Sequence, residues 1–135
     1  VVPIETNALI DRMLRGDFES IFFNYAATDL DPAISRDFWL SSGAAHVWNM
    51  AQAVPATPWE QEIDALMAQQ TATLDPEERR RLFAEVQRVF GEQVPALYLV
   101  APRLYMAVSS RTLNLNPSVL RPQLLWSADT IAVTP

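Results

Sequence analysis

Apolar residues recur with helical spacing after residue 57, and the start of this stretch carries the signals of a helix N-terminus. Thr57 can cap the helix, Pro58 suits the first helical position, and Glu60 completes a capping box with the threonine. One face then collects the apolar side chains Trp59, Ile63, Leu66 and Met67. The pattern predicts an amphipathic helix, and for Trp59 it favours core packing.

A second helix is predicted directly afterwards, beginning at Asp75 and Pro76 with Glu78 in its first turn. Its apolar stripe comprises Leu82, Phe83, Val86, Val89 and Phe90. We expect Gly91 to end this helix, because glycine readily adopts the left-handed conformation found at helix C-termini. Two consecutive helices followed by a strand are therefore expected in the middle of the chain.

The N-terminal part predicts a strand, a helix and a second strand. Residues 1–5 and 18–26 are rich in strand formers, and residues 7–15 predict a short helix capped by Thr6 or Asn7 and ended by Gly16. The run Ile21-Phe22-Phe23 suggests a strand that is buried on both faces. This order predicts a β-α-β unit with parallel strands. The predicted fold class is therefore α/β, in a fragment that mixes α and β elements.

The C-terminal part is less regular. Residues 97–109 form another stretch rich in strand formers, broken by Pro102, which cannot donate to a sheet ladder. The remainder carries few periodic signals, and the length of 135 residues with 50% hydrophobic content favours a single core.

Charge and composition exclude some classes of function. The net charge of -6 and the pI of about 4.6 argue against nucleic-acid binding, which needs clustered positive charge. The one dense basic run, Arg79 to Arg81, lies beside acidic residues and predicts a solvated face with ion pairs. Cysteine is absent, which excludes disulfides and thiolate metal sites, and we predict no cofactor or metal.

Two groups of residues could in principle carry chemistry. His46, the only histidine, has Ser41 and Ser42 nearby, but neither serine lies in a G-x-S-x-G motif, so a structural or surface histidine is favoured. Asp29 and Asp31 could serve acid–base chemistry or hold a cation, but Asp-Leu-Asp-Pro is also a typical turn sequence, which we favour. We therefore expect a protein that is not an enzyme.

Large aromatic residues cluster in the stretch between the second predicted strand and the paired helices. Phe38, Trp39 and Trp48 lie where the sequence otherwise looks irregular, which is typical of core packing or of a binding surface. Tyr25 lies at the C-terminal end of a predicted parallel strand, where ligands bind in open α/β sheets.

Several short motifs resemble, in the same order, the C-terminal half of the family 5 extracellular solute-binding proteins, the peptide- and nickel-type receptors of ABC importers. They are RGDFES at 15–20, DLDP at 29–32, EID at 62–64, DPEER at 75–79, FAEVQ at 83–87 and VPALYL at 94–99. The resemblance runs over nearly the whole chain. Because family members are several times longer, it implies a C-terminal fragment whose export signal lies in a missing N-terminal part.

The resemblance also implies a binding site. Asn24 and Tyr25 occupy the positions of a Gly-Trp pair at the cleft between two lobes, and Thr28 stands where peptide receptors carry an aspartate for the ligand's amino group. Asp29 follows one residue later. The implied ligand-binding residues are Asn24, Tyr25, Ala26, Ala27, Thr28 and Asp29, with Trp48 and Asn49 as additional cleft candidates.

By resemblance, residues 1–101 belong to the C-terminal lobe of a type II periplasmic-binding-protein fold, and residues 102–135 return toward the other lobe. The expected function is periplasmic or extracytoplasmic binding of a small solute or oligopeptide, which two-lobe closure presents to the permease subunits of an ABC transporter. A small hydrolase and a free-standing interaction domain are the alternatives. For the isolated chain we expect a homodimer formed through the apolar residues of 97–131.

Overall fold

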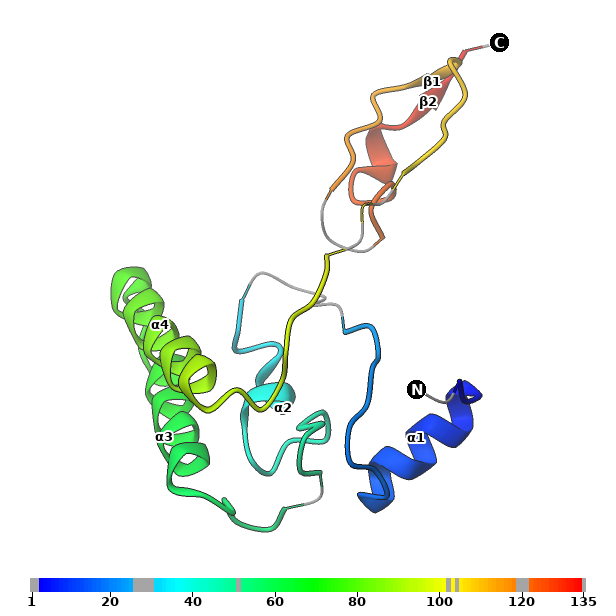
Figure 1. Cartoon of the computed structure of the whole chain (residues 1–135). Helices are drawn as coiled ribbons and strands as arrows, with labels where there is room; N and C mark the ends of the chain where they lie inside the picture. The colour runs from blue at the N-terminus through cyan, green and yellow to red at the C-terminus, as the bar shows by residue number, and fades with distance from the viewer. Residues whose placement is uncertain are drawn as a thin grey trace. The chain divides into compact units, whose positions relative to one another are not determined.

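The computed structural model describes residues 3–25, 31–50, 52–101, 103, 105–118 and 122–134. The chain forms two compact units that divide between Leu97 and Tyr98. The first unit holds all four α-helices of the described residues, and the second holds a small two-stranded sheet (Figure 1). The protein is therefore of mixed α and β class, with helix predominating.

Helices α3 (Pro58–Ala72) and α4 (Pro76–Gln93) lie side by side as a hairpin in the first unit (Figure 1). The predicted capping box of α3 is confirmed: the Glu60 amide donates to Thr57 Oγ1, and the Thr57 amide donates to the Glu60 carboxylate. Asp75 caps α4 as predicted, accepting a hydrogen bond from the Glu77 amide. Both helices thus begin where local sequence signals place them.

The predicted end of α4 is wrong. The helix passes through Gly91 and ends at Gln93, and the capping residue Val94 adopts the left-handed conformation with φ 51°. A valine carries a steric cost in this conformation that glycine would not. The chain turn that follows the helix therefore overrides the local preference of Gly91.

The core of the first unit lies between the helical hairpin and the segment before it. Its buried residues are Phe38, Ile63, Met67, Val86, Val89 and Phe90. Phe38 belongs to a one-turn helix, α2 (Arg36–Trp39), within a segment expected to be irregular. Gly43 allows the chain to turn back over α2, because a Cβ at this position would collide with the backbone carbonyl of Asp37. Trp59 packs against this core, as predicted.

Helix α1 (Thr6–Arg15) confirms the predicted N-terminal helix, and Gly16 ends it with φ 65°. The predicted cap is wrong, because the side chain of Glu5, rather than Thr6 or Asn7, accepts from the amides of the first turn. No residue of α1 is buried. Capping and helix-forming residues therefore account for this helix without burial.

The predicted strands are not found among the described residues of 3–5, 18–25 and 97–109. Phe22 is 74% exposed, which contradicts the predicted burial on both faces, whereas Ile21 and Phe23 are half-buried. The predicted parallel β-α-β unit is therefore wrong for this part of the chain. A strand needs a hydrogen-bonded neighbour, and strand-forming composition alone does not supply one.

The second unit holds the only sheet among the described residues. Strands β1 (Thr112–Leu113) and β2 (Ala132–Val133) pair antiparallel, with Thr112 opposite Val133 and Leu113 opposite Ala132. A 3-10 helix, η1 (Ala128–Thr130), leads into β2, and the side chain of Asn114 donates to the carbonyl of Thr130 at 3.1 Å. These contacts therefore join residues 112–114 to residues 130–133 within the second unit.

Candidate functional site

Tyr25 is the predicted site residue with the clearest surroundings. Its ring packs on the buried ring of Phe38, with centroids 4.5 Å apart, and 43% of the residue remains exposed. Burial of the inner part raises the pKa of the Tyr25 hydroxyl. Asn24, beside it, is exposed. Tyr25 and Asn24 thus present an aromatic ring and an amide to solvent, and the ring rests on the buried side chain of Phe38.

The remaining members of the predicted loop, Ala26, Ala27, Thr28 and Asp29, lie outside the described residues. The proposed replacement of the family's aspartate by Thr28 therefore stays a prediction. Asn24 and Tyr25 lead directly into this loop along the chain.

Trp48 and Asn49 line a hollow of about 400 Å³, which is also bordered by Met13, Phe18 and Met50. The indole of Trp48 nevertheless packs mainly inside the molecule, with ring centroids 5.2 Å from both Phe38 and Phe90. Its Nε1 is buried and has no hydrogen-bond partner among the described residues. Core packing therefore accounts for most of the Trp48 surface, and Asn49 is the exposed member of the pair.

Tyr25 and Trp48 meet at a common neighbour. Both rings contact Phe38, at centroid distances of 4.5 and 5.2 Å, and Phe38 is held by α2. The first predicted site segment and the additional cleft candidates are thus connected through one buried aromatic residue. The sequence indicated an aromatic cluster here, but it did not indicate the short helix that organises it.

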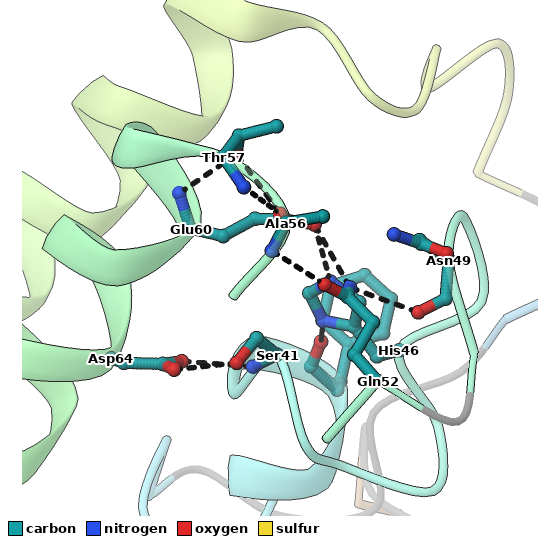
Figure 2. A network of polar contacts seen from close by, with 9 residues as sticks. Ser41, His46, Asn49, Gln52, Ala56, Thr57, Glu60 and Asp64 are labelled. Atoms are coloured by element: carbon teal, nitrogen blue, oxygen red, sulfur yellow. Dashed lines mark hydrogen bonds and ion pairs between the residues drawn. The ribbon is translucent and has the colours of Figure 1, made fainter. Parts of the chain in front are cut away.

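A network of buried polar groups lies beneath this region (Figure 2). His46 is fully buried; its Nε2 lies 3.1 Å from Glu60 Oε1, and its Nδ1 lies 3.3 Å from the carbonyl oxygen of Phe38. Gln52 donates both to Glu60 Oε1 and to the carbonyl of Asn49, each at 3.0 Å. The segment that carries Trp48 and Asn49 is therefore tied to the first turn of α3.

The serine near His46 has a different partner. Ser41 Oγ donates to Asp64 Oδ2 at 2.6 Å, and the Ser41 amide donates to Asp64 Oδ1 at 2.8 Å (Figure 2). A nucleophilic serine needs a base such as histidine at its hydroxyl. Ser41 instead bonds to Asp64, and His46 bonds to Glu60, so each residue forms its own structural link to α3. This agrees with the structural role favoured for His46.

Asp31 forms the predicted turn and also an unexpected ion pair. Its carboxylate accepts from the Ala33 amide at 3.0 Å and from Arg79 Nη2 at 2.7 and 2.8 Å. The Ala33 hydrogen bond and the Arg79 guanidinium hold the pKa of Asp31 below its usual value. In the basic run, Arg80 and Arg81 pair with Glu77 and Glu78 on the helix surface as predicted, whereas Arg79 reaches Asp31 instead.

Sequence reasoning missed the second role of Glu60 and the role of Asp64. The two carboxylates are four residues apart on α3 and so lie on one side of the helix, next to the apolar stripe. That spacing was the signal in the sequence that both carboxylates could contact the same neighbouring segment. It could not name the partners, because His46 and Ser41 reach the helix only through the turns of residues 40–57.

Among the described residues no group of three histidine or acidic side chains could hold a metal ion. Within the same part of the chain, no helix has the length and apolar character needed to cross a bilayer. In comparison with known proteins, no family model, curated protein or solved structure matches this chain.

Proposed function

We propose that the chain is the solute-binding part of an extracytoplasmic receptor that delivers its solute to an ABC importer. The observation that carries the proposal is the ordered series of sequence motifs resembling the C-terminal half of the family 5 solute-binding proteins. Single motifs of this length are common by chance. Their occurrence in the same order over nearly the whole chain is what gives the series its weight.

The half-exposed ring of Tyr25 supports a binding role. An aromatic side chain that is anchored on a buried neighbour loses little conformational freedom when it contacts a ligand. Asn24 adds an exposed amide beside it. On this proposal the solute contacts Asn24, Tyr25 and the loop that follows, with Asn49 at the border of the hollow.

The proposed solute is a small molecule or an oligopeptide. At the position of the family's aspartate, Thr28 is neutral, so an ammonium group buried there would lack a counter-charge unless Asp29 supplied it. We therefore expect weak selection for a free peptide amino terminus. The mechanism is closure of two lobes around the solute, followed by docking on a membrane permease, in the periplasm or an equivalent extracytoplasmic space.

Native mass spectrometry tests this proposal against the hydrolase alternative. The purified protein is incubated with a mixture of di- to pentapeptides, and bound and free peptides are both analysed. A receptor retains a subset of intact peptides, and Tyr25→Ala reduces their retention, while Tyr105→Ala in the second unit leaves it unchanged. Cleavage products that accumulate with time and require Ser41 or His46 would favour the hydrolase and contradict the proposal.

A further inference from the structure

His46 faces hydrogen-bond acceptors at both of its ring nitrogens. Nδ1 lies 3.3 Å from the backbone carbonyl of Phe38, and Nε2 lies 3.1 Å from Glu60 Oε1. A carbonyl oxygen and a carboxylate accept hydrogen bonds and do not donate them. Neutral imidazole carries a single N–H, so it can satisfy only one of these two contacts.

The Glu60 carboxylate cannot readily supply the missing proton. Its Oε1 also accepts from Gln52, and its Oε2 accepts from the amide and the hydroxyl of Thr57, both at 2.9 Å. Burial raises the pKa of Glu60, but the hydrogen bonds from His46, Gln52 and Thr57 outweigh burial and lower it overall. These donors favour the ionised carboxylate, which leaves the second proton to the ring.

The charged groups on the helices of the first unit have other partners. Asp64, one turn along α3, is held by Ser41. On α2, Arg36 and Asp37 are exposed, and Arg36 Nε lies 3.9 Å from Asp37 Oδ1. On α4, Arg88 pairs with acidic residues at the helix surface. Among the described residues, Glu60 is thus the charged group that meets the ring.

We infer that His46 is a proton-operated latch, which holds the segment carrying Trp48 and Asn49 on α3 as an imidazolium between Glu60 and the Phe38 carbonyl. Loss of one proton would leave one ring nitrogen with its lone pair toward an acceptor: Nδ1 would face the Phe38 carbonyl if Nε2 kept its proton for the Glu60 carboxylate, and His46 and Glu60 are both almost fully buried. An unpaired buried contact of this kind is unfavourable, so the segment opens. The latch stands independently of any bound solute.

The segment held by the latch carries two of the candidate cleft residues. The imidazole of His46 lies 3.9 Å from the indole of Trp48, measured between ring centroids, and Gln52 holds the carbonyl of Asn49. Opening of the segment would therefore displace Trp48 and Asn49 together. On the proposed function, this would make solute binding depend on pH.

Amide hydrogen exchange followed by NMR tests the latch. The Ala45 amide donates to the Asp37 carbonyl on α2, and the amides of His46 and Asn49 donate to the carbonyls of Gly43 and His46, so the three amides report on opening of the segment. The closed state binds one more proton than the open state, so closure weakens as pH rises above the range where free imidazole titrates, about 6.5. After correction for intrinsic exchange, the opening constant should increase about tenfold per pH unit above that range.

Glu60→Gln removes the negative partner and should abolish this pH dependence, whereas Glu62→Gln, a surface carboxylate on the same helix, should keep it. The ¹⁵N shifts of the ring give a second readout that needs no variant, because His46 is the only histidine. Two protonated ring nitrogens in the folded protein at about pH 7.5, where free imidazole is mostly neutral, support the latch. A neutral ring at that pH, or an opening constant that does not change with pH, overturns it.

Discussion

The Asp31 carboxylate shows how one residue can join two parts of the first unit. It accepts from the Ala33 amide within its own turn and from the guanidinium of Arg79 on α4. The side chain of Arg79 is only 30% exposed, which distinguishes this pair from the more exposed pair of Arg80 with Glu77 on the same helix. The turn that follows the candidate loop is thereby fixed to the helical hairpin.

Asp31→Asn should lower the stability of the protein at neutral pH, and the difference should disappear in acid. The folded state holds the pKa of Asp31 below its usual value, so its stabilisation is present above the unfolded pKa and is lost as pH falls through the folded value. Urea unfolding of both proteins between about pH 7 and 3 measures this. Glu77→Gln, which removes an exposed i,i+3 pair, serves as the control and should change stability little.

Ile63→Ala tests the core at the scale of one side chain. Ile63 is 1% exposed and lies in the cluster between α3 and α4, so the substitution should destabilise by about 2–5 kcal/mol. Leu74→Ala removes a similar volume where the side chain is 95% exposed, and it should cost far less. Equal losses in urea unfolding would show that this core is assigned wrongly.

At the scale of elements, the helices could be predicted from sequence because their signals are local. The capping residues Thr57, Glu60 and Asp75 bond to backbone groups within a few residues of their own positions. The apolar stripes are visible from the helical spacing of residues within each helix. Strands could not be predicted in this way. Whether residues 18–25 pair depends on a neighbour that composition does not specify, and the end of α4 depends on the turn at Val94.

Gly91→Ala distinguishes the observed end of α4 from the predicted one. Gly91 lies inside the helix, and an added Cβ would meet nothing within 4 Å, so alanine should stabilise by about 0.5–1 kcal/mol. Gly16→Ala is the matched comparison, because Gly16 has φ 65° and alanine should destabilise there. Destabilisation by Gly91→Ala would mean that the helix stops at Gly91.

Much of the candidate site could not be derived from sequence, for a physical reason. Tyr25 was indicated by the resemblance and by the end of a predicted strand that is not found among the described residues, and its half-exposed ring suits a binding role. The link between His46 and Glu60 spans 14 residues and depends on how residues 40–57 turn back onto α3. The sequence singled out His46 but not its partner Glu60, because only the folded chain pairs them.

At the scale of the whole molecule, the stretch from residue 97 to 108 exposes many apolar side chains. Leu97, Leu99, Val100 and Tyr105 are between 66% and 85% exposed. Extended apolar segments of this kind tend to pair with another chain. We predict concentration-dependent self-association, which sedimentation velocity would detect and Val100→Lys would weaken. A strict monomer at high concentration would contradict this prediction.

The most direct test of the solute-binding proposal is calorimetric titration of the best-retained peptide from the native mass spectrometry screen. Tyr25→Ala should weaken binding by about 1–3 kcal/mol, because the half-exposed ring is proposed to be a desolvated anchor in the complex. Tyr105→Ala, which truncates a residue that is 85% exposed in the second unit, should leave the affinity unchanged. Equal affinity of the wild type and Tyr25→Ala would contradict the account.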